Sequence, residues 1–319
     1  MTEPHVFLNG QHIAASAAHL KIYDAGVVLG ATVTEMVRTF GRSMYRLDDH
    51  LARLERSLKY VRFDIGQTMD ELAREVTALV EHNAGLLPHP DDELGLVVFV
   101  TAGEYPTYAG SAGASGDNRP TVCAHTFPLP WELWAGKLDC GQHVVTPSIR
   151  HVPPQCFDPK MKYRSRMHYY LADQEAKVAD PGAIALLLDL DGNVTETGGA
   201  NFLMVQNGTI VSPTLRNTLP GISRQTVIEL AAELGIPFVE RDFQVFDVIS
   251  ADEAFTATTP YCLMPVTRIN GLPIGDGQPG PILRQLLEAW GTRVGLNVYE
   301  QIRAGAIRRQ EAALAGAAS

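Results

Sequence analysis

The stretch from residue 184 to residue 234 constrains the fold most, because short apolar runs alternate there with tight turn signals. Residues 184–190 and 201–205 have the pattern of buried strands, and glycine-containing turns follow each run. Asn207-Gly208 is a strong hairpin signal, and a helical period begins at Ile222. Strands and helices mixed in this way predict an α+β fold.

The N-terminal part carries equally local signals. Asn9-Gly10 stands between two apolar runs and predicts a hairpin. Further along, apolar residues recur at helical spacing from Leu51 to Val61, and Asp48 or Asp49 is the expected N-cap of this helix. Thr68 with Glu71 three residues later has the capping-box pattern, which predicts that a second helix begins there.

The length of 319 residues favours two domains. A proline-stiffened segment with Trp131 and Trp134 is the expected connector between them. We expect the last helix over 281–290, a flexible loop over 109–118, and an Ala-rich end after Arg303 that is either a frayed helix or disordered. The predicted divisions are an N-terminal α/β domain (1–128), a connector (129–136), a C-terminal cofactor-binding domain (137–303) and an Ala-rich tail (304–319).

Charge and motif content exclude several classes of function. Acidic residues number 36 against 26 basic ones, a net charge of −10 without a basic run, which disfavours nucleic acid or anionic membranes as partners. The four cysteines and ten histidines lack the spacing of metal ligands, so no metal site is expected. The motifs of serine hydrolases, Rossmann folds and P-loops are missing too. Without a signal-peptide pattern or a membrane-length apolar run, we expect a soluble, cytoplasmic protein.

Lysine is scarce, and two of the six lysines fall in one basic segment. Lys160, Lys162, Arg164 and Arg166 place four cations within seven residues. Their mutual repulsion lowers the pKa of a lysine among them, which favours a nucleophilic amine. A basic surface turn is the alternative interpretation.

Two further segments could carry chemistry. Glu196 precedes a glycine-rich turn between apolar strands, where it is either a functional carboxylate or an exposed turn residue. Residues 218–227 form a turn that leads directly into a helix. The backbone N–H groups of Ile222 and Ser223, the serine hydroxyl and the helix dipole would suit a phosphate. An ordinary serine-capped helix start is the alternative.

In this order the segments resemble the class IV (fold type IV) pyridoxal-phosphate aminotransferases over nearly the whole chain. The resemblance rests on Glu-x-x-x-x-Asn-Phe from Glu196, Leu-Pro-Gly-Ile-Ser-Arg from Leu219, and Thr258-Thr259 followed by Met-Pro-Val. It implies a two-domain fold with a smaller N-terminal α/β domain and a larger C-terminal pseudo-barrel domain. It also implies pyridoxal 5′-phosphate as the cofactor and a homodimer as the working assembly.

The resemblance assigns roles residue by residue. Lys162 corresponds to the lysine that forms the Schiff base with the cofactor, and Glu196 to the carboxylate on the pyridine nitrogen. Leu219 would pack against the cofactor ring. The implied phosphate-binding residues are Arg53, Ile222, Ser223 and Thr259, and the candidates for contact with the substrate are Thr34, Arg38, Arg164 and Arg166.

The predicted function is therefore exchange of an amino group between an amino acid and a 2-oxo acid. A branched-chain or similar apolar amino acid is the first expectation for the substrate. Within the same fold a D-amino-acid aminotransferase or a 4-amino-4-deoxychorismate lyase are alternatives. A binding protein without cofactor is a further alternative.

Overall fold

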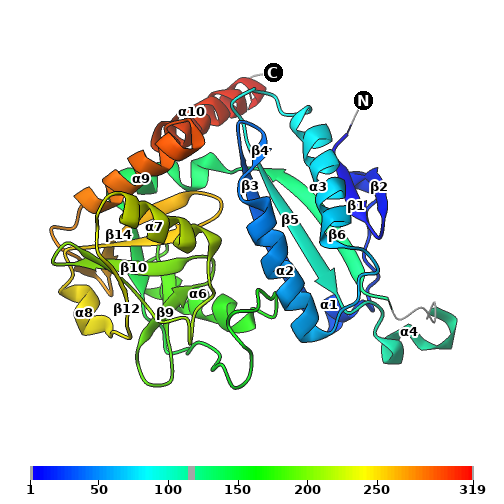
Figure 1. The fold of residues 1–319 in the computed structure, drawn as a ribbon, viewed down its shortest axis with the longest axis horizontal. Helices are drawn as coiled ribbons and strands as arrows, with labels where there is room; N and C mark the ends of the chain where they lie inside the picture. The colour runs from blue at the N-terminus through cyan, green and yellow to red at the C-terminus, as the bar shows by residue number, and fades with distance from the viewer. Residues whose placement is uncertain (1–2, 114–118, 318–319) are drawn as a thin grey trace. The chain divides into compact units, whose positions relative to one another are not determined.

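The structure is a computed structural model that describes residues 3–113 and 119–317 (Figure 1). Backbone contacts divide the chain into two compact units. Unit 1 comprises residues 1–129 and 161–165, and unit 2 comprises residues 130–160 and 166–319. The domain boundaries expected from the sequence stay a prediction, and each unit is described by itself.

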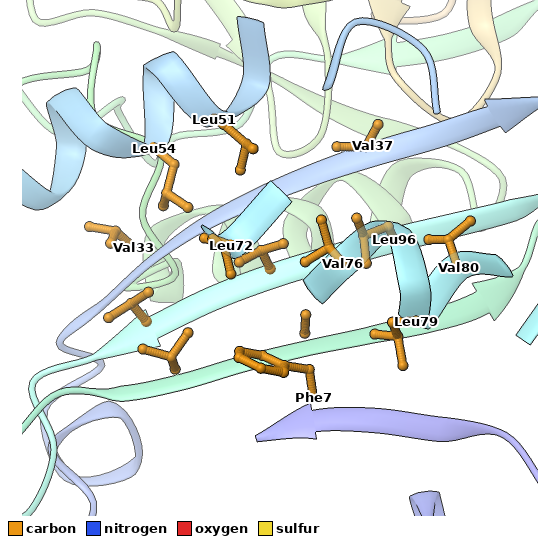
Figure 2. Packing of buried hydrophobic residues seen from close by; sticks show 14 of the residues in the cluster. Phe7, Val33, Val37, Leu51, Leu54, Leu72, Val76, Leu79, Val80 and Leu96 are labelled. Carbon is orange, nitrogen blue, oxygen red and sulfur yellow. The ribbon is translucent and has the colours of Figure 1, made fainter. Parts of the chain in front are cut away.

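Unit 1 is built on a six-stranded sheet with the order β2-β1-β6-β5-β3-β4. The helices α2 and α3 pack on this sheet and on each other. Apolar side chains from both helices and from the central strands form one core (Figure 2). The strands are β1 (His5–Leu8), β2 (Gln11–Ala14), β3 (Thr32–Phe40), β4 (Ser43–Met44), β5 (Leu94–Thr101) and β6 (Thr121–Pro128), and the helices are η1 (Ala15–Ala17), α1 (Ala25–Val28), α2 (Leu47–Val61), α3 (Met69–Ala84) and α4 (Pro106–Gly113).

Two local predictions in unit 1 are confirmed and one is wrong. Asn9 and Gly10 turn β1 into β2 with positive φ of 50° and 84°, and Thr68 with Glu71 forms the complete capping box of α3. The predicted N-cap of α2 is wrong. Its N-cap is Arg46, in the left-handed conformation, so that Asp48 and Asp49 lie in the first turn instead. Acidic side chains stabilise a helix there through its dipole, without capping it.

The segment 161–165 belongs to unit 1 although the chain on both sides of it belongs to unit 2. Thr34 donates its N–H to the carbonyl of Lys162 (2.9 Å), and Arg164 donates its N–H to the carbonyl of Thr32 (3.0 Å). These bonds and the bridge between Val33 and Tyr163 pair the segment with β3. The backbone of the predicted nucleophile is thereby fixed to a strand far from it in sequence.

Unit 2 contains a closed ring of six strands. Each strand pairs with the next in the order β10-β13-β14-β7-β8-β9. The ring closes because β9 also pairs with β10. The residues opposite each other at this last pairing are Glu196 and Asn201. The ring matches the expected pseudo-barrel. The ring strands are β7 (Gln142–Val145), β8 (Ile184–Leu188), β9 (Val194–Thr197), β10 (Asn201–Gln206), β13 (Glu253–Thr258) and β14 (Cys262–Ile269), and β11 (Thr209–Ser212), β12 (Phe238–Glu240) and β15 (Leu272–Pro273) extend the sheet.

The helices of unit 2 pack around this sheet. α6 packs on β7 and β8, and α7 packs on β12 and β13. Their bounds are η2 (Trp131–Leu133), α5 (Ala135–Cys140), α6 (Met167–Ala179), α7 (Ile222–Glu233), α8 (Val245–Ile249), α9 (Pro281–Val294) and α10 (Val298–Ala317).

The structure differs from two expectations for segments that lack a strong apolar pattern. The helix over 281–290 is not the last one, because α10 follows it and takes up residues 304–317 of the Ala-rich tail. Residues 318–319 lie outside the described residues. Of the expected loop 109–118, residues 109–113 belong to α4 and the others lie outside the described residues. In the described parts of the chain, no helix is both long and apolar enough to cross a membrane.

Candidate active site

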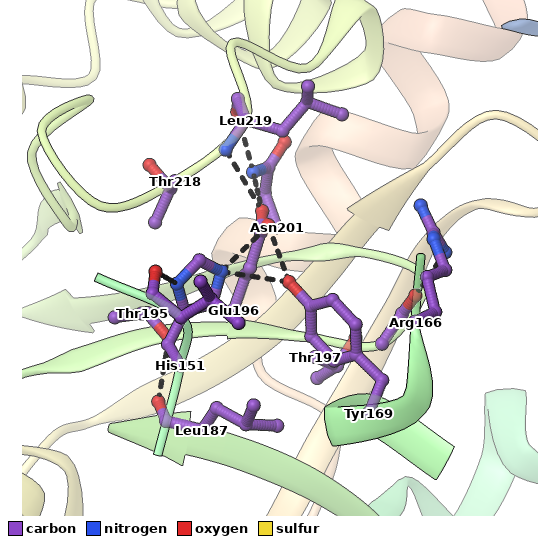
Figure 3. Close-up of polar contacts among 12 residues, drawn as sticks. His151, Arg166, Tyr169, Leu187, Thr195, Glu196, Thr197, Asn201, Thr218 and Leu219 are labelled. Carbon is purple, nitrogen blue, oxygen red and sulfur yellow. Dashed lines mark hydrogen bonds and ion pairs between the residues drawn. The ribbon is translucent and has the colours of Figure 1, made fainter. Parts of the chain in front are cut away.

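Glu196 is a buried carboxylate, about 9% exposed, at the point where the ring of strands closes. The Tyr169 hydroxyl donates to its Oε1 (3.0 Å). The side-chain amide of Asn201 and the backbone N–H of Leu219 both donate to its Oε2 (3.0 and 3.2 Å), as Figure 3 shows. All three donors are neutral, so they hold the carboxylate in place without cancelling its charge.

His151 and Tyr169 were missed by the sequence reasoning. Nε2 of His151 lies 2.9 Å from the Tyr169 oxygen and 3.7 Å from Oε1 of Glu196. His151 follows β7 and Tyr169 lies on α6, so only tertiary structure brings them to β9 (Figure 3). The role of Asn201 could have been inferred from the sequence, because this residue is the Asn of the Glu-x-x-x-x-Asn-Phe pattern that starts at Glu196.

The predicted phosphate cradle lies at the start of α7. Gly221 is the N-cap of this helix and no side chain caps it, so Ser223 is not the cap residue. The helix therefore offers the N–H groups of its first turn to an anion. A Cβ on Gly221 would lie 2.0 Å from Oδ1 of Asn201, which explains the glycine. Ser223 is buried, and Ile222 and Leu219 are half-buried.

In unit 1, Arg53 makes a bidentate ion pair with Glu35. Nε and Nη2 of Arg53 donate to the two carboxylate oxygens (2.7 and 2.8 Å), and Nδ1 of His50 donates to Oε2 (2.8 Å). All three side chains are almost fully buried. Burial raises the pKa of the Glu35 carboxyl, but the charge and hydrogen bonds of Arg53, with those of His50, outweigh it and hold this pKa at about 2. Burial also lowers the pKa of His50, and the charges of Arg53 and Lys162 add to that effect.

Lys162 is the half-buried lysine of its segment, whereas Lys160 is exposed. The charge of Lys162 acts on His50, which in turn contacts the Glu35–Arg53 pair. Unit 1 therefore brings the predicted nucleophile within electrostatic range of His50, which shares the Glu35 carboxylate with the predicted phosphate-binding arginine.

The four candidates for substrate contact have partners of their own. Thr34 donates its hydroxyl to the carbonyl of Val98 (2.9 Å), and Arg38 is buried with its guanidinium 3.8 Å from the centre of the Phe40 ring. Arg164 lies over Phe99 in unit 1. In unit 2, Nη1 of Arg166 donates to the carbonyl of Gly198 (2.6 Å), which ties it to the turn after Glu196.

The remaining cofactor candidate, Thr259, is half-buried and directly follows β13. Its neighbour Thr258 donates its hydroxyl to the carbonyl of Gly199 (2.6 Å), so this corner contacts the turn after β9. The roles assigned to all these side chains stay predictions. Within residues 3–113 and 119–317, no cluster of three or more His, Cys, Asp or Glu side chains could hold a metal ion.

Comparison with known proteins gives one matching family. The model of the family described as "Amino-transferase class IV" matches residues 32–269. A protein of Methanocaldococcus jannaschii that is provisionally named a branched-chain-amino-acid aminotransferase is 30% identical over 300 residues, which cover 93% of this chain and 99% of that protein. The D-alanine aminotransferase of Bacillus licheniformis is 29% identical over 89% of this chain and 95% of its own.

Among solved structures, the T.th. branched-chain amino acid aminotransferase with pyridoxamine 5′-phosphate matches with a TM-score of 0.80. The two sequences are 25% identical, and the match covers 92% of this chain and 95% of that one. This likeness confirms the fold that the sequence predicted.

Proposed function

The chain belongs to the class IV aminotransferases, and from that premise we propose that it moves an amino group from a branched-chain or similar apolar amino acid to a 2-oxo acid. It is a transaminase that uses pyridoxal 5′-phosphate, as the family predicts. Bound to the protein, this cofactor accepts electron density from the carbon that loses its proton.

The observation that carries the proposal is the environment of Glu196. Neutral donors fix both of its oxygens, and its negative charge is left to act on a positive group. A protonated pyridine nitrogen is such a group, and a carboxylate beside it keeps it protonated. The residues of unit 2 therefore fit the ring of the cofactor.

The start of α7 fits the phosphate of the cofactor. Its first-turn N–H groups and the Ser223 hydroxyl are hydrogen-bond donors, and no side chain caps the helix. We assign Ile222, Ser223, Thr259 and Arg53 to the phosphate and Leu219 to the ring. Arg53 already forms an ion pair with Glu35. It therefore neutralises less of the phosphate charge than an arginine that has no carboxylate partner would.

Lys162 is assigned as the residue that links to the cofactor and moves the proton. With the cofactor bound, its amine would take the proton from the α-carbon of the amino acid. Arg53 and Lys162 lie in the same unit, and the charge of Lys162 acts on His50 there. Borohydride reduction followed by peptide mapping is expected to find the adduct at Lys162, and an adduct at Lys160 would contradict this assignment.

The substrate is proposed from the relatives. The Methanocaldococcus jannaschii and T.th. proteins carry branched-chain names, whereas the Bacillus licheniformis protein acts on D-alanine by its name. This second name keeps a D-amino-acid aminotransferase as the alternative. Contact with the substrate is assigned to Thr34, Arg38, Arg164 and Arg166, of which Arg166 contacts the turn after Glu196 through its bond to Gly198.

Two further proposals concern the working state. We propose a homodimer, since a neighbouring copy completes the active site in the family that the sequence resembles. We also propose a cytoplasmic location. Sedimentation of the active enzyme tests the first point, and a fully active monomer would contradict it.

The deciding experiment is an assay of the purified full-length protein with L- and D-isomers of leucine, valine and alanine, and 2-oxoglutarate as acceptor. We expect turnover of L-leucine and L-valine together with a cofactor absorbance near the edge of the visible range. Turnover of the D-isomers alone would establish the alternative. In a separate assay, pyruvate release from 4-amino-4-deoxychorismate without an acceptor would indicate a lyase. A protein without cofactor absorbance would contradict the proposed function. Lys162→Ala is the matched inactive control.

A further inference from the structure

The sheet of unit 1 has a second face, opposite the face that its helices cover. Successive residues of a strand point to opposite faces. Val33 of β3 and Leu96 of β5 pack with the helix residues in the core shown in Figure 2. Thr34 and Phe99 therefore point to the other face. Phe99 is buried there in a separate apolar cluster with Cys123.

Strand register places Lys162 and Phe99 in one row across this second face. Thr34 donates its N–H to the carbonyl of Lys162, and Thr34 is also the partner of Phe99 in the pairing of β3 with β5. Neighbouring strands lie about 4.8 Å apart, so the backbones of Lys162 and Phe99 are separated by about 10 Å. Tyr163 belongs to the helix-covered core, so Lys162 and Arg164 on either side of it belong to the second face.

The guanidinium of Arg164 lies over the ring of Phe99. Its central carbon is 4.5 Å from the centre of that ring. The electrostatics of the neighbouring strand agree with this position. Burial raises the pKa of the Cys123 thiol to about 11, and the charge of Arg164 opposes this rise. Burial also lowers the pKa of His125, and the charge of Arg164 adds to that effect. The positive charge therefore lies over β5 and β6.

An arginine held in this way suits a carboxylate ligand. A cation on the face of an aromatic ring is attracted by the ring, and a planar guanidinium stacked there keeps N–H donors at its edge. Arg164 is exposed. Its donors match the two oxygens of a carboxylate, which is a charge-assisted and bidentate contact.

The other two arginines that the sequence offered for the substrate are placed differently. Arg38 is buried, and its Nε donates to the carbonyl of Thr39 (3.1 Å). Arg166 is half-buried in unit 2 and donates to the carbonyl of Gly198. Of the three, Arg164 is the exposed one, and it lies on the same face of unit 1 as the predicted nucleophile.

We propose that Arg164 binds a carboxylate of the substrate, and that Phe99 is the positioning residue that holds the guanidinium for this contact. The inference rests on the proposed function, because transamination supplies substrates that all carry a carboxylate. Amino acids and 2-oxo acids have one beside the reacting carbon, and dicarboxylic members have a second at the far end of the chain. Either is the same ligand for a guanidinium.

The test is calorimetric titration of the full-length protein, purified with pyridoxal 5′-phosphate, with 4-methylpentanoate and with glutarate. Arg164→Gln should weaken the binding of one or both acids by about 10- to 100-fold, as expected for a lost hydrogen-bonded ion pair. Loss for both acids would identify the carboxylate beside the reacting carbon, and loss for glutarate alone the far one. Equal affinities in variant and wild type would overturn the proposal, as would a wild-type protein that binds neither acid.

The positioning role of Phe99 is tested by coupling the two residues. Phe99→Leu keeps an apolar side chain but removes the ring, so we expect binding weaker by about 3- to 10-fold. In the Arg164→Gln background the same change should have no further effect, because Phe99 acts through Arg164. Phe99→Tyr keeps a ring and should retain the wild-type affinity. Independent, additive losses would overturn the positioning role.

Arg74→Gln is the matched control for charge. Arg74 is an exposed residue of α3, the helix that packs on the opposite face of the same sheet. It should leave both affinities unchanged, and a loss equal to that of Arg164→Gln would overturn the proposal. Cofactor absorbance and turnover of the wild-type protein are measured separately. Their absence contradicts the proposed function, whereas the acid affinities decide this inference.

Discussion

Glu35 in unit 1 and Glu196 in unit 2 are both buried carboxylates, but their partners differ in charge. Arg53 meets Glu35 with two hydrogen bonds, and His50 adds a third. Two neutral side chains and one backbone N–H meet Glu196. The charge of Glu35 is thus used inside the fold, whereas that of Glu196 remains for a ligand. The comparison indicates that burial alone does not identify a functional carboxylate, and that the charge of its partners does.

The largest effect expected from this comparison is on stability. Glu35→Gln leaves the Arg53 guanidinium buried without its anion, which costs about 3–5 kcal/mol. Urea unfolding measures this loss. As a control, Glu75→Gln breaks the exposed contact with His12 and should cost less than about 1 kcal/mol. Equal losses in the two variants would contradict the structural role of Glu35.

For Glu196→Gln we expect the main loss in catalytic rate, whereas for Glu35→Gln it lies in stability. The amide cannot hold a pyridinium, so we expect kcat to fall by about 30- to 1000-fold, which corresponds to about 2–4 kcal/mol in the transition state. KM and cofactor binding should change little, since the phosphate contacts remain. Single-turnover rates of each half-reaction measure the effect. An unchanged rate with full cofactor occupancy would remove Glu196 from the mechanism.

The pH dependence of stability should report on Glu35 as well. The pKa of Glu35 is about 2 in the folded protein and near 4.5 in its ordinary state, so the folded form binds the proton less readily. Its contribution of up to about 3 kcal/mol is complete above pH 4.5 and is lost as the pH falls toward 2. The free energy of unfolding, measured from pH 6 to pH 2, should fall less steeply in Glu35→Gln. Parallel curves for variant and wild type would refute this assignment.

The smallest effect is expected for Gly221→Ala. The new Cβ would lie 2.0 Å from Oδ1 of Asn201, so the amide that holds Glu196 must move. We expect a loss of about 1–3 kcal/mol in stability, typical of overpacking, with weaker cofactor binding. Gly199→Ala is the matched control, since a Cβ at Gly199 meets no atom within 4 Å. Equal losses at both glycines would show that the Asn201 contact is unimportant.

Local chemistry made much of the fold predictable from the sequence. The Asn9-Gly10 turn and the Thr68 capping box depend on neighbouring residues only, and both are confirmed. The N-cap of α2 was predicted wrongly, since the sequence does not show that Arg46 takes the left-handed conformation that starts the helix. The Ala-rich end lacks a strong apolar period, so the sequence left a frayed helix and disorder both open there, and the structure has the helix α10.

Residues of the candidate site could be predicted only where they belong to a recognisable sequence motif. Glu196 and Asn201 lie in one recognisable pattern, and the structure places them opposite each other. Tyr169 and His151 belong to no such pattern, because their contacts join a loop, a helix and a strand. The pairing of Glu35 with Arg53 likewise joins β3 to α2, and residue type alone does not reveal it.

The pairing of residues 161–165 with β3 has a consequence for dissecting the molecule. Because this segment returns to unit 1, the chain passes between the units at three points, after residues 129, 160 and 165. A gene fragment that stops at residue 129 would encode a sheet without the partner of Thr32 and Thr34, and without Lys162. A fragment that starts at residue 130 would carry that segment with no strand to bind. Neither half can be shuffled between relatives as a self-sufficient module, so the two units are expected to be inherited together.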